Sequence, residues 1–157
     1  MKSKVQLSKY AFLLTLVVNG VLLAGCILTF GKGPGFWIFL GVLAFLIILG
    51  LLYAPVSIIS TPDKVTIKTV LNKRSIPINE IENVELFQPT MGAYRLCASG
   101  GYFGYWGLFR EGDVGKYIAF YGKASDCFLI TMKKGNKYVL GCINPGETVD
   151  YIKQQLK

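Results

Sequence analysis

The chain enters a long uncharged stretch at Tyr10, which reads YAFLLTLVVNGVLLAGCILTF (10–30), GKGPG (31–35) and FWIFLGVLAFLIILGLLY (36–53). Each apolar run approaches the ~20 residues that an α-helix needs to cross a hydrocarbon core of about 30 Å. The break of glycine, lysine and proline between them is too short to fold by itself. The sequence therefore predicts two antiparallel membrane-spanning helices, over residues 10–30 and 36–53, within an N-terminal hairpin domain of residues 1–54.

Positive charge is concentrated at the two ends of this hairpin, whereas its loop carries only Lys32. The flanking cations are Lys2, Lys4, Lys9, Lys64, Lys68, Lys73 and Arg74. Because loops rich in Lys and Arg stay on the cytoplasmic side of a membrane, the pattern predicts a multi-pass protein with both termini in the cytoplasm. Asn19 is the one strongly polar residue inside the runs, and it can hydrogen-bond across the helix pair.

A second interpretation of the N-terminus remains open. Leu23-Ala24-Gly25-Cys26 resembles a bacterial lipobox, whose cysteine is lipidated and becomes the new N-terminus. Against this, the apolar run continues to Phe30, and a second apolar run follows almost at once. Length and flanks favour an uncleaved helix.

Composition sets limits on the chemistry. The net charge is +8, but the chain outside the hairpin segment has thirteen Lys and Arg against nine Asp and Glu, so a nucleic-acid partner is not expected. The four cysteines form no Cys-x-x-Cys pair and the chain has no histidine. A Cys/His zinc site and a Ser-His-Asp triad are therefore excluded, and we expect no cofactor, no metal and no enzymatic activity.

Residues 55–157 read as a separate β-rich domain facing water. Short alternating or β-branched segments are separated by turn signals such as Asn72-Lys73 and Gly135-Asn136. After a short apolar run at 56–59, the expected strands lie near residues 64–68, 75–78, 84–87, 94–98, 117–121, 127–132 and 138–143. Asn144 can then cap a C-terminal helix that has Pro145 at its first position and apolar residues at helical spacing. About seven strands and a C-terminal capping helix are the order of a pleckstrin-homology (PH)-like barrel.

Residues 94–109, which read YRLCASGGYFGYWGLF, carry a resemblance to a known family. The stretch is similar to the pattern of bacterial PH-domain membrane proteins, in which an arginine precedes a glycine-rich turn with aromatic residues and a Gly-x-Phe. The matching residues are Arg95, Gly100, Gly101, Tyr102, Phe103, Gly104, Tyr105, Trp106, Gly107 and Phe109. Ala98 and Gly122-Lys123 depart from it. The resemblance spans about 57–156 and implies a PH-like fold and the bacterial inner membrane, but no particular chemistry.

Two groups of residues are candidates for binding. Lys64, Lys68, Lys73 and Arg74 on the first β-hairpin of the domain suit orientation on an anionic membrane surface or binding of a lipid headgroup. The glycine-aromatic stretch suits positive φ angles in a twisted hairpin, with its rings either in the barrel core or at an exposed tip. Arg95 is expected to pair with Glu85 or Glu111.

The sequence thus favours a non-enzymatic module for protein interaction or assembly, held at the cytoplasmic face of the membrane. The partners expected are membrane lipids and an unidentified protein, and the small residues of the helices also favour a homo-oligomer. Specific binding of an anionic phospholipid or other small ligand by the first β-hairpin is the alternative. The third hypothesis is a small transport or pore-forming protein with Asn19 near the path of the solute. It is disfavoured because the two apolar runs contain no charged residue.

Overall fold

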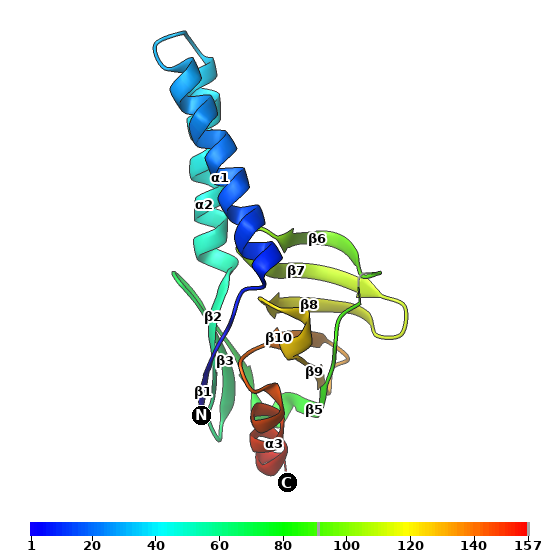
Figure 1. Ribbon diagram of the computed structural model, residues 1–157. Coiled ribbons are helices and arrows are strands. Elements are labelled where there is room, and N and C mark those ends of the chain that lie inside the picture. Colours follow the sequence, from blue (N-terminus) through cyan, green and yellow to red (C-terminus); the bar gives the residue numbers. More distant parts are fainter. Residues whose placement is uncertain (91, 157) are drawn as a thin grey trace.

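The computed structural model, which describes residues 1–90 and 92–156, has a long helical hairpin rising from a β-rich domain (Figure 1). Helix α1 spans Lys9–Thr29 and helix α2 spans Gly35–Tyr53. The Ser8 hydroxyl caps α1 by accepting a hydrogen bond from the Ala11 N–H at 3.1 Å. Both helices are long and apolar enough to cross a membrane, and only 11% of each apolar window is buried by the protein.

The domain consists of two sheets and a short helix. The four-stranded sheet has the order β1-β2-β3-β4, with bounds Lys2–Lys4, Pro55–Ser60, Lys64–Thr69 and Lys73–Pro77. The six-stranded sheet has the order β5-β9-β10-β8-β7-β6, with bounds Ile81–Leu86, Cys127–Met132, Lys137–Gly141, Gly115–Tyr121, Gly104–Glu111 and Tyr94–Gly101. Helix α3 spans Pro145–Gln155, at the end of the molecule away from the helical hairpin (Figure 1).

This arrangement confirms the PH-like fold, with differences in detail. The barrel is not closed, because the strands form two separate sheets. The described chain after the hairpin contains nine strands rather than about seven, and β10 pairs with β8 in parallel. The Asn144 side chain does not cap the α3 backbone but donates to the Glu147 carboxylate at 3.4 Å.

The main core lies between the two sheets and is closed by α3. It includes Ile67, Phe120, Phe128 and the α3 residues Val149 and Ile152, each at most 4% exposed. A second, smaller cluster covers the outer face of the six-stranded sheet and includes Phe109, Tyr117 and Tyr121. Phe87 and Ala93 pack against this cluster, and a pocket beside the start of α1 opens over Phe109 and Tyr121.

The first residues of the chain belong structurally with the β-rich domain, although sequence analysis groups them with the hairpin. Strand β1 pairs with β2, placing Ser3 opposite Ile58. The Ser8 N–H then donates to the Gly122 carbonyl at 2.8 Å. A side chain at Gly122 would collide with the Gln6 carbonyl, so this close approach requires glycine. The hairpin is therefore joined to the domain on both sides, through β1 before α1 and through β2 after α2.

Candidate functional site

The β6–β7 hairpin lies against the two anchor helices and joins them to the domain. The Phe103 N–H donates to the Thr15 hydroxyl oxygen at 2.8 Å, and the Tyr102 hydroxyl donates to the Asn19 side-chain oxygen at 3.2 Å. On α2, the Tyr53 ring stacks on Trp106 at 5.1 Å between centroids. Thr15 and Asn19 of α1 are thus engaged by the β6–β7 tip of the domain.

Backbone geometry explains the glycine-rich sequence of this hairpin. Gly101, Gly104 and Gly107 have φ angles of 131°, 94° and 111°, as predicted, and Phe103 also has a positive φ of 52°. A Cβ atom at Gly107 would collide with the backbone of Cys97 and Ala98 on the paired strand. The tight tip projects Tyr102 and Phe103 toward the helices, where their rings pack edge to face at 4.9 Å.

The aromatic residues of the β6–β7 hairpin contact different parts of the protein. Tyr102 and Phe103 contact the anchor helices, which is neither the barrel core nor the free tip that the sequence suggested. The Trp106 indole N–H donates to the Tyr102 carbonyl at 3.1 Å, and its ring packs against the main core. Tyr105 faces the other side of the sheet, where it stacks on Tyr121 at 4.8 Å. Sequence reasoning did not anticipate the anchor as the docking surface.

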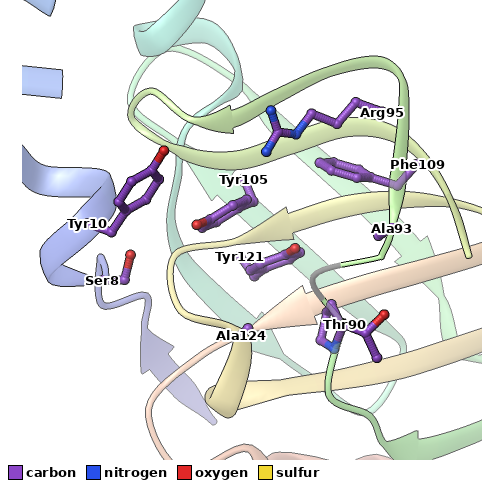
Figure 2. Close-up of a pocket in the computed structure, with 10 residues that line it drawn as sticks. Ser8, Tyr10, Thr90, Ala93, Arg95, Tyr105, Phe109, Tyr121 and Ala124 are labelled. Carbon is purple, nitrogen blue, oxygen red and sulfur yellow. The ribbon is translucent and has the colours of Figure 1, made fainter. Parts of the chain in front are cut away.

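A pocket opens on this second face, between the start of α1, residues 89, 90 and 93, and strands β6 to β8 (Figure 2). Its volume is about 440 Å³. It is lined by Ser8, Tyr10, Pro89, Thr90, Ala93, Arg95, Tyr105, Phe109, Tyr121 and Ala124. Figure 2 shows Tyr10 on one side and Thr90 on the other, with Tyr105 and Tyr121 between them. The pocket therefore combines aromatic walls with hydroxyl groups at its edges.

Arg95 is the charged side chain of this pocket. It lies over β6, where the absence of a side chain at Gly100 leaves room for its guanidinium group. Among residues 1–90 and 92–156, no carboxylate lies within 4.0 Å of it. The predicted ion pair with Glu85 or Glu111 is therefore wrong: Glu85 is exposed on β5, at the opposite edge of the sheet, and Glu111 is bound elsewhere.

Glu111 fixes the segment that closes the pocket. One carboxylate oxygen accepts from the N–H and hydroxyl of Thr90 at 3.0 and 2.5 Å, and the other accepts from the Tyr117 hydroxyl at 3.2 Å. Burial raises the pKa of Tyr121 well above its ordinary value. Burial, with the nearby Glu111 carboxylate, does the same to the pKa of Tyr117. Both phenols therefore remain neutral at physiological pH and keep their O–H groups as donors.

The basic cluster of the first β-hairpin is only partly brought together. Lys68 stands opposite Lys73 across β3 and β4, beside the turn that faces α2. Lys64 lies at the other end of β3, opposite Pro77. Arg74 packs its guanidinium over the Tyr53 and Phe120 rings, at 5.5 and 5.3 Å from their centroids. These four basic side chains therefore do not converge on a single site for one headgroup.

Cys127 and Cys142 lie close to each other, near the paired ends of β9 and β10, whereas the other two cysteines lie in different parts of the molecule. Cys26 is buried within the helical hairpin, and Cys97 is exposed on β6. Burial raises the pKa of the Cys127 and Cys142 thiols, so both stay protonated. In the described part of the chain, no group of three or more Cys, Asp or Glu is arranged to hold a metal ion.

Comparison with known proteins matches residues 56–156 to the family described as the bacterial PH domain. The chain belongs to this family. No curated protein and no solved structure gave a significant match. Its bacterial PH domain together with two N-terminal apolar helices fits a membrane-associated module. PH domains are generally binding modules rather than enzymes, so the pocket beside the anchor is considered as a binding site.

Sequence reasoning found Arg95, Tyr105 and Phe109 through the family resemblance, but missed the rest of the pocket. Tyr10 appeared only as the first residue of a predicted membrane helix, and Ser8 was not singled out. Their role in the wall depends on the contact between the N-terminal segment and Gly122, which joins residues more than a hundred positions apart. A detectable signal did exist for the docking site, because Thr15 and Asn19 lie four residues apart and therefore share one helix face.

Proposed function

We propose that this bacterial PH-domain protein is a multi-pass, membrane-anchored binding module without enzymatic activity, with both termini in the cytoplasm. Its ligand is an anionic group on an apolar stem, as in the headgroup region of an anionic phospholipid, held in the pocket of Figure 2. The observation that carries this proposal is the Arg95 guanidinium, which has no carboxylate partner within 4.0 Å in the described chain and lines an aromatic pocket at the first turn of the anchor.

The location and chemistry of the pocket both favour such a ligand. Tyr10 belongs to the first turn of α1, so the pocket lies where the anchor leaves the membrane and where headgroups are concentrated. The planar guanidinium of Arg95 matches phosphate oxygens, and the stacked Tyr105 and Tyr121 rings suit the apolar stem. A volume of about 440 Å³ lies within the usual range of small-ligand sites.

The test compares Arg95→Gln with Arg110→Gln in the full-length protein, in zwitterionic nanodiscs or detergent. Arg110 is the matched control, because it is an exposed arginine on the adjacent strand β7 and does not line this pocket. Charge-assisted hydrogen bonds contribute about 1.5–3 kcal/mol when buried, and partial exposure reduces this to about 1 kcal/mol, or roughly fivefold in affinity. We expect that loss for phosphatidylglycerol with Arg95→Gln alone.

Three ligands separate the sources of the anionic group: phosphatidylglycerol, glycerol phosphate and inorganic phosphate. Binding of the lipid alone identifies a membrane ligand, whereas equal binding of all three identifies a phosphate site without use of the apolar walls. Equal affinity of the two variants for every ligand would refute the role of Arg95. Native mass spectrometry counts bound lipids, and calorimetry measures the soluble ligands.

A protein partner is the second candidate, as the interaction or assembly module that the sequence favours. It is supported by β6, which ends the six-stranded sheet and has no strand paired at its outer edge in the part of the chain that the structure describes. Such edges accept a strand from another chain. Crosslinking from a photoreactive residue at Leu96, an exposed β6 position, identifies a partner or a second copy, whereas crosslinks to lipid alone contradict this candidate.

A further inference from the structure

The turn between β3 and β4 presents two apolar side chains beside the membrane anchor. Val70 is 54% exposed and Leu71 is 62% exposed. The Leu71 N–H donates to the Leu51 carbonyl of α2 at 3.1 Å, which fixes the turn against the last turns of that helix. Figure 1 shows the end of β3 reaching up beside the lower end of α2. Leu51 belongs to the apolar run of α2, so this exposed Val-Leu pair lies at a level of the helix where lipid is expected.

The β6–β7 tip is held even farther along the helices. Its partner Asn19 is the eleventh residue of α1, about 15 Å from Lys9 at a rise of 1.5 Å per residue. Beyond Asn19 only ten residues of α1 remain, again about 15 Å. A hydrocarbon core of about 30 Å needs the whole length of both helices. If the hairpin spans the bilayer, the domain must therefore enter the nearer leaflet.

The charges around the turn suit the same environment. Lys68 and Lys73 face each other across β3 and β4, directly below Val70 and Leu71. At a membrane surface, such long side chains can reach the lipid phosphates while the apolar pair lies among the acyl chains. Exposed apolar residues also recur along both helices, between Phe12 and Leu28 on α1 and between Trp37 and Ile48 on α2.

We propose that the β3–β4 turn is a third membrane contact, with Val70 and Leu71 inserted into the leaflet nearest the domain and Lys68 and Lys73 at its headgroups. This proposal rests on the membrane anchorage proposed above, but not on the ligand pocket. The domain then lies partly sunk in the bilayer surface, rather than suspended below it on a linker.

The experiment places an environment-sensitive NBD label on single cysteines of the full-length protein in phosphatidylcholine–phosphatidylglycerol nanodiscs. Cys97→Ser removes the exposed native thiol, and Leu71→Cys or Val70→Cys supplies the test position. Asn136→Cys, on the exposed β9–β10 turn, is the water control. Ile27→Cys, 75% exposed on α1, is the lipid control.

We expect blue-shifted emission, quenching by spin-labelled lipids and loss of iodide quenching at positions 71 and 27, with the opposite behaviour at position 136. If the label at position 27 reports lipid but the labels at positions 70 and 71 both report water, insertion of the turn is refuted while the anchorage stands. Water signals at position 27 as well would overturn the anchorage itself, and the insertion with it.

Discussion

The contact between Gly50 of α2 and the Phe103 ring provides a sharp test of how the anchor and the domain are joined. A Cβ atom at Gly50 would lie 2.5 to 2.9 Å from three atoms of the Phe103 ring. At Gly41 on the same helix, a Cβ atom would meet nothing within 4 Å. Gly50→Ala therefore introduces a collision with the β6–β7 tip, whereas Gly41→Ala makes the same chemical change without one.

The difference between the two variants isolates the cost of this collision. Alanine gains about 0.5–1 kcal/mol over glycine in a helix interior, and the gain is shared by both positions. Overpacking a well-filled contact costs about 1–3 kcal/mol. The Phe103 ring cannot retreat freely, because its own N–H is held by Thr15 at 2.8 Å and its ring packs on Tyr102. We therefore expect Gly50→Ala to be about 1–3 kcal/mol less stable than Gly41→Ala.

Thermal unfolding of the full-length variants in nanodiscs measures this difference. For a domain of ~100 residues, 1 kcal/mol shifts Tm by about 4–8 °C, so Gly50→Ala should melt at least about 4 °C below Gly41→Ala. Trp106 fluorescence follows the same contact, since its ring stacks on Tyr53 one turn below Gly50. Equal Tm values with unchanged Trp106 emission would refute the view that this hairpin is packed against the anchor.

Two further predictions concern named hydroxyl groups. Tyr102→Phe removes the hydrogen bond to Asn19 and should lower the free energy of unfolding by about 0.5–1.5 kcal/mol. Hydrogen exchange should become faster only at the β6–β7 tip. Unchanged exchange there would contradict this contact. Because Tyr117 and Tyr121 have raised pKa values, the unfolded chain loses their protons before the folded chain does as pH rises above about 10. The free energy of unfolding, measured with denaturant, should therefore stay constant below that pH and fall above it. The fall should be less steep in Tyr121→Phe than in the parent protein. Equal slopes in the two proteins would contradict a raised pKa of Tyr121.

The helical hairpin and most strands were readable from the sequence because each depends on local pattern. Uncharged runs of membrane length defined α1 and α2, and period-two alternation with turn residues defined strands such as Lys64–Thr69. The positive φ angles of Gly101, Gly104 and Gly107 followed from the density of glycine around aromatic residues. These features are decided by neighbours in the chain, so no knowledge of the tertiary fold was needed.

The pocket and the join between anchor and domain were not readable, because long-range pairing decides them. Strand β1 consists of Lys2–Lys4, three residues with no β pattern of their own, and it forms only because β2 is available beside it. Glu111 was expected as a partner of Arg95, yet its carboxylate accepts hydrogen bonds from Thr90. The ion pair predicted between Arg95 and Glu111 does not form, because Thr90 and Tyr117 supply neutral donors to the Glu111 carboxylate.

The same long-range contacts bear on the N-terminus. Cleavage before Cys26 would remove β1, the Ser8 contact with Gly122, and the Thr15 and Asn19 side chains that hold the β6–β7 tip. The domain would then lose a sheet strand and both hydrogen bonds between its β6–β7 tip and α1, at a cost that no lipid on Cys26 restores. The structure thus gives a physical reason, independent of helix length, to expect an uncleaved α1: the residues ahead of Cys26 are part of the fold that α1 supports.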